Sequence, residues 1–172
     1  MIQVGPTCDC PLNRLMPQIA KRYPWFRLEQ IDPLADPEEA YDSRRQQYHS
    51  TRILVLLERK VEQLEFARLL GVAGFDLYVP GMNFVFGEAR CPGRVGVIST
   101  YRLKPLSPNR SDLFEQRVVK EAVHEIGHML GLRHCFDSLC VMHFSEKIID
   151  TDRKHAEPCR NCQSRLEEGG FE

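Results

Sequence analysis

The sequence predicts an α/β protein, a sheet covered by helices, on three observations. Short apolar runs typical of strands alternate along the chain with helical patterns, which is the arrangement that α/β architectures require. The 172 residues are 42% hydrophobic and 27% charged, enough for one domain with a sizeable core. The clearest helical pattern carries an apolar stripe wide enough to be buried. We therefore expect one domain over 1–172, made of an N-terminal part (1–131) and a C-terminal part (132–172).

The first fifty residues predict short elements. Residues 2–5 form an apolar run typical of a strand. Apolar residues recur at helical spacing over 11–23, where Pro17 should kink or shorten the helix. Residues 25–31 alternate between apolar and polar, which indicates a half-buried strand. Residues 35–47 are polar and begin with the composition of a helix start.

The middle of the chain predicts most of the sheet. A mostly apolar helical face over 50–63 indicates a core helix. Strand-like runs follow at 65–72, 83–88 and 94–103, and Pro80-Gly81 indicates a turn between the first two. Residues 107–109 have the composition of a loop.

The best helix begins at Asp112. Asp112 and Glu115 have the spacing of a capping box, although aspartate replaces the usual serine or threonine. An apolar stripe then runs to Leu130, so the helix should be well buried. Gly131 is expected to end it.

Three histidines on and after this helix predict a catalytic metal site. His124 and His128 lie four residues apart, so both imidazoles face the same side of the helix. His134 can join them only if the chain turns sharply, and Gly131 tolerates such a turn. Three imidazoles with an open fourth position are typical of catalytic zinc. Glu125 should lie close to a zinc-activated water and act as its general base. The alternative is a surface helix with incidental histidines, which the apolar stripe disfavours.

Four cysteines in the last quarter predict a second metal site. Cys135 and Cys140 form one pair, Cys159 and Cys162 another, with zinc-ribbon-like spacing. We expect a structural zinc that holds the C-terminal segment under the active site and fixes His134 beside it. The alternatives are a redox dithiol in the second pair or unrelated free thiols. One zinc at each site gives two zinc ions per chain. The sequence indicates no role for Cys8, Cys10 and Cys91.

Charge and hydropathy exclude several function classes. The net charge is −1, from 23 basic and 24 acidic residues, so no overall field attracts nucleic acid or an anionic membrane. No apolar run is long enough to span a bilayer, and the N-terminal residues do not form a secretion signal. We therefore expect a cytoplasmic monomer without nucleic-acid or membrane partners.

The assembled pattern resembles a known family. HExxHxxGxxH with a downstream methionine resembles the metzincin metallopeptidases, and the four-cysteine pattern after it resembles the archaemetzincins. Two upstream stretches, 43–48 and 81–87, are also similar to that family. The resemblance implies a compact metzincin-like fold with a twisted mixed β-sheet, a backing helix, an active-site helix and a zinc-pinned C-terminal segment.

The resemblance also implies roles for other residues. Met142 would be the Met-turn residue beneath the imidazoles, although by itself it is equally a core methionine. An edge strand over 83–88 would bind extended substrate by strand addition, with His143 and Phe144 as candidate pocket walls. The candidate substrate-binding residues are thus Asn83, Phe84, Val85, Phe86 and His143.

Two functions remain open at this point. The first is a zinc metallopeptidase that cuts peptide or protein substrates, either internally or from the amino terminus. An aminopeptidase needs a carboxylate to hold the substrate's α-amino group, and Glu88 is a speculative candidate. The second is a zinc-stabilised peptide-binding or regulatory protein with little turnover. Neither His49 nor His155 has a ligand spacing to the main set, so both are expected to be ordinary surface or hydrogen-bonded residues.

Overall fold

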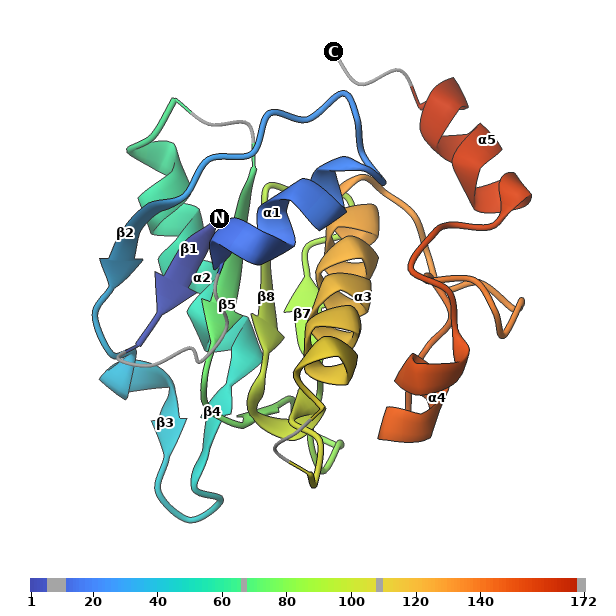
Figure 1. Cartoon of the computed structure of the whole chain (residues 1–172). Coiled ribbons are helices and arrows are strands. Elements are labelled where there is room, and N and C mark those ends of the chain that lie inside the picture. Colours follow the sequence, from blue (N-terminus) through green and yellow to red (C-terminus); the bar gives the residue numbers. More distant parts are fainter. Residues whose placement is uncertain (6–11, 66–67, 108–109, 170–172) are drawn as a thin grey trace.

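A computed structural model describes residues 1–5, 12–65, 68–107 and 110–169 (Figure 1). A five-stranded mixed sheet has the order β2-β1-β5-β8-β7, in which only β7 is antiparallel to its neighbour. A second, three-stranded sheet has the order β3-β4-β6. The strands are β1 (Ile2–Val4), β2 (Ile31–Leu34), β3 (Tyr41–Asp42), β4 (Gln47–His49), β5 (Leu69–Ala73), β6 (Leu77–Tyr78), β7 (Gly87–Ala89) and β8 (Val95–Ser99). The helices are α1 (Leu12–Ala20), α2 (Ser50–Glu62), α3 (Ser111–Met129), α4 (Ile148–Arg153) and α5 (Arg160–Glu168), with 3-10 turns at Glu38–Ala40 and Tyr101–Leu103.

The main sheet separates two apolar cores, because successive strand residues point to opposite faces. Leu70 and Val72 of β5 face α1 and α3, whereas Leu69 and Ala73 face α2. In Figure 1, α1 and α3 lie in front of this sheet and α2 lies behind it. Both β5 and β8 are buried along their whole length, which explains their nearly continuous apolar sequences. The predicted α/β fold is confirmed.

The predicted helix that carries His124 and His128 is α3, which crosses the sheet beside β8 and β7. Its C-terminus is a Schellman motif: Gly131 N–H donates to the His128 carbonyl at 2.8 Å, and Leu132 N–H donates to Gly127 at 2.9 Å. Gly131 has φ +88°, so this turn uses the left-handed conformation that the sequence predicted. None of the helices in the described ranges has the length and apolarity needed to cross a membrane.

Several predicted boundaries were wrong. Residues 25–30 form no strand, because Phe26 turns back onto Tyr23 and both aromatic rings pack together. Residues 35–47 form a single 3-10 turn and a β3–β4 hairpin instead of a helix. The hairpin is set by Asp42, whose carboxylate accepts the N–H groups of Arg44 and Arg45.

The N-terminus of α3 and the C-terminal helices also differ from the prediction. Helix α3 begins at Ser111 with Arg110 at its N-cap, and no side chain caps it, so the capping box at Asp112 does not form. Helices α4 and α5 were not predicted, because their short sequences show little apolar periodicity. They are held instead by polar contacts to α3 and by the cysteine cluster.

The predicted strand over 83–88 is shorter and later than expected. Regular pairing with β8 covers only Gly87–Ala89, and Val85 makes one isolated bridge to Leu77. The carbonyls of Met82 and Asn83 accept hydrogen bonds from side chains instead of a neighbouring strand. Residues 6–11, which include Cys8 and Cys10, and residues 108–109 of the predicted loop lie outside the described residues.

Candidate active site

The structure brings the three histidines together at the C-terminal end of α3. The Nε2 atom of His128 lies 3.1 Å from that of His124 and 3.2 Å from that of His134. Nitrogen ligands of a tetrahedral zinc, at about 2.0–2.1 Å from the metal, are separated by about 3.3 Å. The spacing of the three imidazoles therefore fits one zinc ion.

Two of these rings are oriented by backbone carbonyls. The Nδ1 atom of His124 lies 2.8 Å from the Val141 carbonyl, and that of His128 lies 2.7 Å from the Leu132 carbonyl. Nδ1 is then the donor, and Nε2 keeps its lone pair for a metal. Burial holds the pKa of His124 well below its usual range and lowers that of His134 to about 4. Both imidazoles are therefore neutral at pH 7, which is the form that binds metal.

Glu125 lies beside the histidines in a buried position. Its Oε2 atom is shielded from solvent and has no hydrogen-bond partner among the described residues. Burial, and then the charge of Glu121, raise the pKa of Glu125 well above its usual range. A raised pKa brings a carboxyl group closer to the range in which it can both accept and release a proton. An unpaired buried carboxylate oxygen is costly, which is consistent with a functional role.

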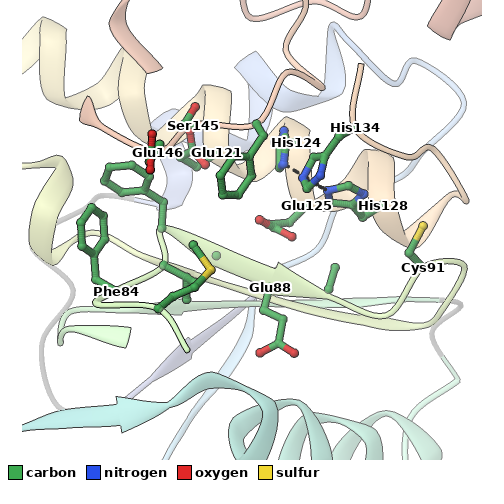
Figure 2. A pocket seen from close by; sticks show the side chains of 16 residues that line it. Phe84, Glu88, Cys91, Glu121, His124, Glu125, His128, His134, Ser145 and Glu146 are labelled. Carbon is green, nitrogen blue, oxygen red and sulfur yellow. Dashed lines mark hydrogen bonds between the residues drawn. The ribbon is translucent and has the colours of Figure 1, made fainter. Parts of the chain in front are cut away.

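A cleft of about 280 Å³ opens over this site. Figure 2 shows the imidazoles and Glu125 above the edge strand β7, with Phe84 at one end and Cys91 at the other. The described lining residues are Met82, Phe84, Val85, Phe86, Gly87, Glu88, Ala89, Cys91, Glu121, His124, Glu125, His128, His134, Phe144, Ser145 and Glu146.

Only some of the predicted substrate-binding residues line this cleft. Phe84, Val85 and Phe86 line it, whereas Asn83 and His143 do not appear among its described lining residues. His143 instead places Nδ1 2.9 Å from the Cys135 carbonyl. The sequence interpretation missed Ala89, Glu121 and the Ser145–Glu146 pair, since none of them belongs to a recognisable spacing.

Glu88 is not available as an anchor for an amino group. Its carboxylate accepts hydrogen bonds from Ser50 Oγ and from Thr51 Oγ1, at 2.9 and 3.0 Å for the latter. In Figure 2 its side chain extends away from the histidines. Glu88 thus ties β7 to the first turn of α2, and the suggested aminopeptidase role has no support in this arrangement.

Met142, for which the resemblance suggests the Met-turn role, is fully buried against α3. A Cβ atom built at Gly127 would lie 2.4 Å from its sulfur, so this close approach requires glycine at that helix position. Met142 also accepts the N–H of Cys135 through its carbonyl at 2.9 Å. The chain around the methionine is therefore linked directly to the residue that follows His134.

Gly87 provides a test of how closely Glu125 is packed. A Cβ at Gly87 would lie 2.5 Å from Glu125 Oε1, so Gly87→Ala must displace the carboxylate. We expect kcat of a reaction that uses Glu125 to fall by about 10²-fold, since misplacement by about 1 Å costs that much. Zinc content should stay at the wild-type value, and unchanged kcat would contradict the packing described here.

The four cysteines form a second cluster next to the first. Cys135 Sγ lies 3.8 Å from Cys159 Sγ, and Cys140 Sγ lies 3.8 Å from Cys162 Sγ. Sulfur ligands of a tetrahedral zinc, at about 2.3 Å from the metal, are also about 3.8 Å apart. The four sulfur atoms lie within 4.8 Å of one another, so the donor set fits a closed zinc site.

Comparisons with known proteins agree with this geometry. The profile described as "Peptidase family M54" matches residues 33–168. An archaemetzincin from Archaeoglobus fulgidus is 48% identical over 128 residues, covering 74% of each chain. The crystal structure of archaemetzincin from Methanopyrus kandleri superposes with a TM-score of 0.86 at 37% identity, over 98% of this chain and 93% of that one. The A. fulgidus crystal structure, a complex with malonate, gives a TM-score of 0.73 at 41% identity, over 95% and 98% of the two chains.

The fold, the cleft with its imidazole cluster and these similarities define the class: the protein is a zinc metallopeptidase, a hydrolase of peptide bonds. It therefore acts on peptide or protein substrates. More narrowly, the chain belongs to peptidase family M54, the archaemetzincins. The resemblance noted in the sequence is thereby confirmed.

Proposed function

We propose that the chain hydrolyses peptide bonds in the cleft over α3, with Glu125 as general base and then as proton donor to the leaving amine. The observation that carries this proposal is the placement of the buried Glu125 carboxyl group, whose Oε2 has no hydrogen-bond partner among the described residues, next to three converging imidazoles. His124, His128 and His134 would hold a catalytic zinc. Zinc bound there supplies Lewis-acid chemistry, because it acidifies a water molecule and polarises the substrate carbonyl.

Other groups of the protein would orient the imidazoles, exclude water and align the substrate. The Val141 and Leu132 carbonyls orient two of the imidazoles, and the fully buried Met142 would exclude water from below. Burial raises the pKa of Glu125 above its usual range, which favours the proposed roles of accepting and then releasing a proton. The exposed edge of β7 would align an extended substrate by strand addition, at Gly87–Ala89 and not at the predicted 83–88.

We further propose that Cys135, Cys140, Cys159 and Cys162 hold a second, structural zinc. A closed set of four thiolates leaves no position for a substrate. The total of two zinc ions per chain, the monomeric state and the cytoplasmic location remain predictions. Zinc analysis and light scattering of the purified protein would test the first two.

The decisive experiment compares the zinc-loaded wild type with Glu125→Ala on a diverse peptide mixture, read by mass spectrometry. We expect cleavage by the wild type and a fall of about 10²–10⁴ in the variant, the usual contribution of a general base. Glu115→Ala is the matched control, since Glu115 lies on the same helix and only pairs with Arg14 at 3.4 Å near the surface. Equal cleavage by Glu125→Ala would refute the role of Glu125. A fully loaded wild type that cleaves nothing would favour the peptide-binding alternative.

A further inference from the structure

The segment 82–86 forms much of one cleft wall but has little regular pairing of its own. Met82, Phe84, Val85 and Phe86 line the cleft. The backbone of the segment is held by a turn, from Met82 N–H to the Val79 carbonyl at 3.1 Å, and by the bridge to Leu77. At its end, the Phe86 carbonyl accepts the N–H of Ser99 at 2.7 Å. The carbonyls at the start of the segment are bonded instead by side chains from outside it.

Two side chains of the β3–β4 hairpin supply these hydrogen bonds. The Arg45 Nη2 atom donates to the Met82 carbonyl and to the Asn83 carbonyl, each at 3.0 Å. Gln47 Nε2 donates to the same Asn83 carbonyl at 2.9 Å, and its Oε1 accepts from Arg45 Nε at 2.9 Å. The two side chains thus form one unit, called here the hairpin clamp, which holds consecutive carbonyls of the wall.

The hairpin clamp is anchored by a second layer of contacts. The Arg45 guanidinium lies 4.3 Å from the centre of the Tyr78 ring, within the range of a cation–π interaction. Gln47 Nε2 also donates to Asp76 at 2.9 Å, and Asp76 forms an ion pair with Arg102 at 2.7 Å. Arg102 in turn lies 4.3 Å over the ring of Phe84. One polar network therefore holds both the backbone of the wall and an aromatic side chain that lines the cleft.

We propose that Arg45 and Gln47 are positioning residues for substrate binding: they order the 82–86 wall so that its apolar side chains are presented to the peptide. This inference rests on the proposed peptidase function. It gives a role to the 43–48 stretch, for which the sequence suggested no chemistry. The wall carries Met82, Phe84 and Phe86, and Phe144 lines the same cleft, so the substrate side chain that depends on the clamp is a bulky apolar one.

A planar guanidinium suits this task better than an ammonium group. Its fork can donate to two acceptors at fixed angles while its face packs on an aromatic ring. Ordering the wall before substrate arrives lowers the entropic cost of binding. Loss of the clamp should therefore raise KM and leave kcat nearly unchanged, which is the signature of lost binding that is uniform between ground state and transition state.

The test compares wild type, Arg45→Ala and Arg45→Lys, with Arg44→Ala as matched control. Arg44 is the adjacent exposed arginine, and its side chain makes no hydrogen bond or ion pair with the described residues. Hydrogen exchange of the 82–86 amides is measured first. We expect about tenfold faster exchange in Arg45→Ala, confined to this segment, because charge-assisted bonds to its carbonyls are lost. Arg45→Lys should be intermediate, and Arg44→Ala should match the wild type.

The second measurement is kinetic and uses a quenched fluorescent version of the peptide that the wild type cleaves best in the mixture. We expect Arg45→Ala to raise KM about fivefold or more with kcat within about twofold of wild type. Unchanged exchange over 82–86, or faster exchange with unchanged KM, would overturn the inference. So would equal effects of Arg44→Ala. A wild type that cleaves no peptide refutes the proposed function instead, and the exchange measurement still decides whether the clamp orders the wall, since it needs no turnover.

Discussion

Replacing Cys159 by serine should unfold the C-terminal segment and remove one zinc per chain. The thiols of Cys135 and Cys159 lie 3.8 Å apart, and the Cys159 N–H also donates to Cys140 Sγ at 3.2 Å. Apparent binding free energies of structural zinc are about 10–16 kcal/mol, comparable to the whole stability of a domain, about 5–15 kcal/mol. We expect the unfolding temperature of Cys159→Ser to fall by about 10 °C or more.

His128→Ala is the matched variant for this prediction. It removes a ligand from the proposed catalytic site, where the chain is held by α3 and its Schellman motif. We expect it to lose the other zinc but to keep circular dichroism and an unfolding temperature close to wild type. If Cys159→Ser still held two zinc ions at the wild-type unfolding temperature, the assignment of the cysteine cluster would be wrong.

Replacing Lys154 by methionine should destabilise the protein by about 3–5 kcal/mol, the usual cost of leaving one member of a buried ion pair alone. Lys154 Nζ lies 3.1 Å from Glu121 Oε1, and the side chains of the pair are 0% and 3% exposed. Glu121 also accepts a hydrogen bond from Thr151 Oγ1 at 3.0 Å. In Lys154→Met the Glu121 carboxylate would stay buried between α3 and α4 without its cation. Urea unfolding gives the free energy directly.

The double variant Glu121→Leu/Lys154→Met separates charge from packing. Replacing a whole buried pair by apolar residues is often neutral or stabilising, so the double variant should regain most of the loss. The control is Arg14→Met, which breaks the Arg14–Glu115 pair, where Arg14 is 68% exposed. Its effect should be about 0–1 kcal/mol. Additive losses in the double variant would show that the buried pair is not the source of the stability.

The Glu121–Lys154 pair, which stabilises the fold, also connects two parts of the cleft. Glu121 lines the cleft, and Lys154 Nζ lies 3.5 Å from the carbonyl of His143, which precedes the lining residues Phe144, Ser145 and Glu146. The pair therefore joins the helix that carries Glu125 to the opposite wall. Neither residue stood out in the sequence, because the two are 33 positions apart and belong to no repeating pattern.

The parts of the protein that depend on local geometry could be predicted from the amino-acid sequence. Helical periodicity places His124 and His128 on one face, and Gly131 allows the turn that brings His134 to them, so three converging imidazoles could be predicted from spacing. The main buried strands followed from continuous apolar runs, although their ends shifted by a few residues. The cysteine cluster was likewise recognisable, because pairs of metal-binding cysteines have a characteristic spacing in the sequence.

The construction of the cleft around this centre could not be predicted and is seen only in the folded protein. The wall at 82–86, the orientation of Glu88 towards α2, and the buried pair of Glu121 with Lys154 all depend on side chains that meet across roughly 30–40 positions. Hydrogen bonds and ion pairs of this kind have no period in the sequence, since each is made only after the sheet and helices have brought its partners together. The three histidines lie within one helix and the turn that follows it, whereas the surfaces proposed to meet a substrate are assembled from the whole fold.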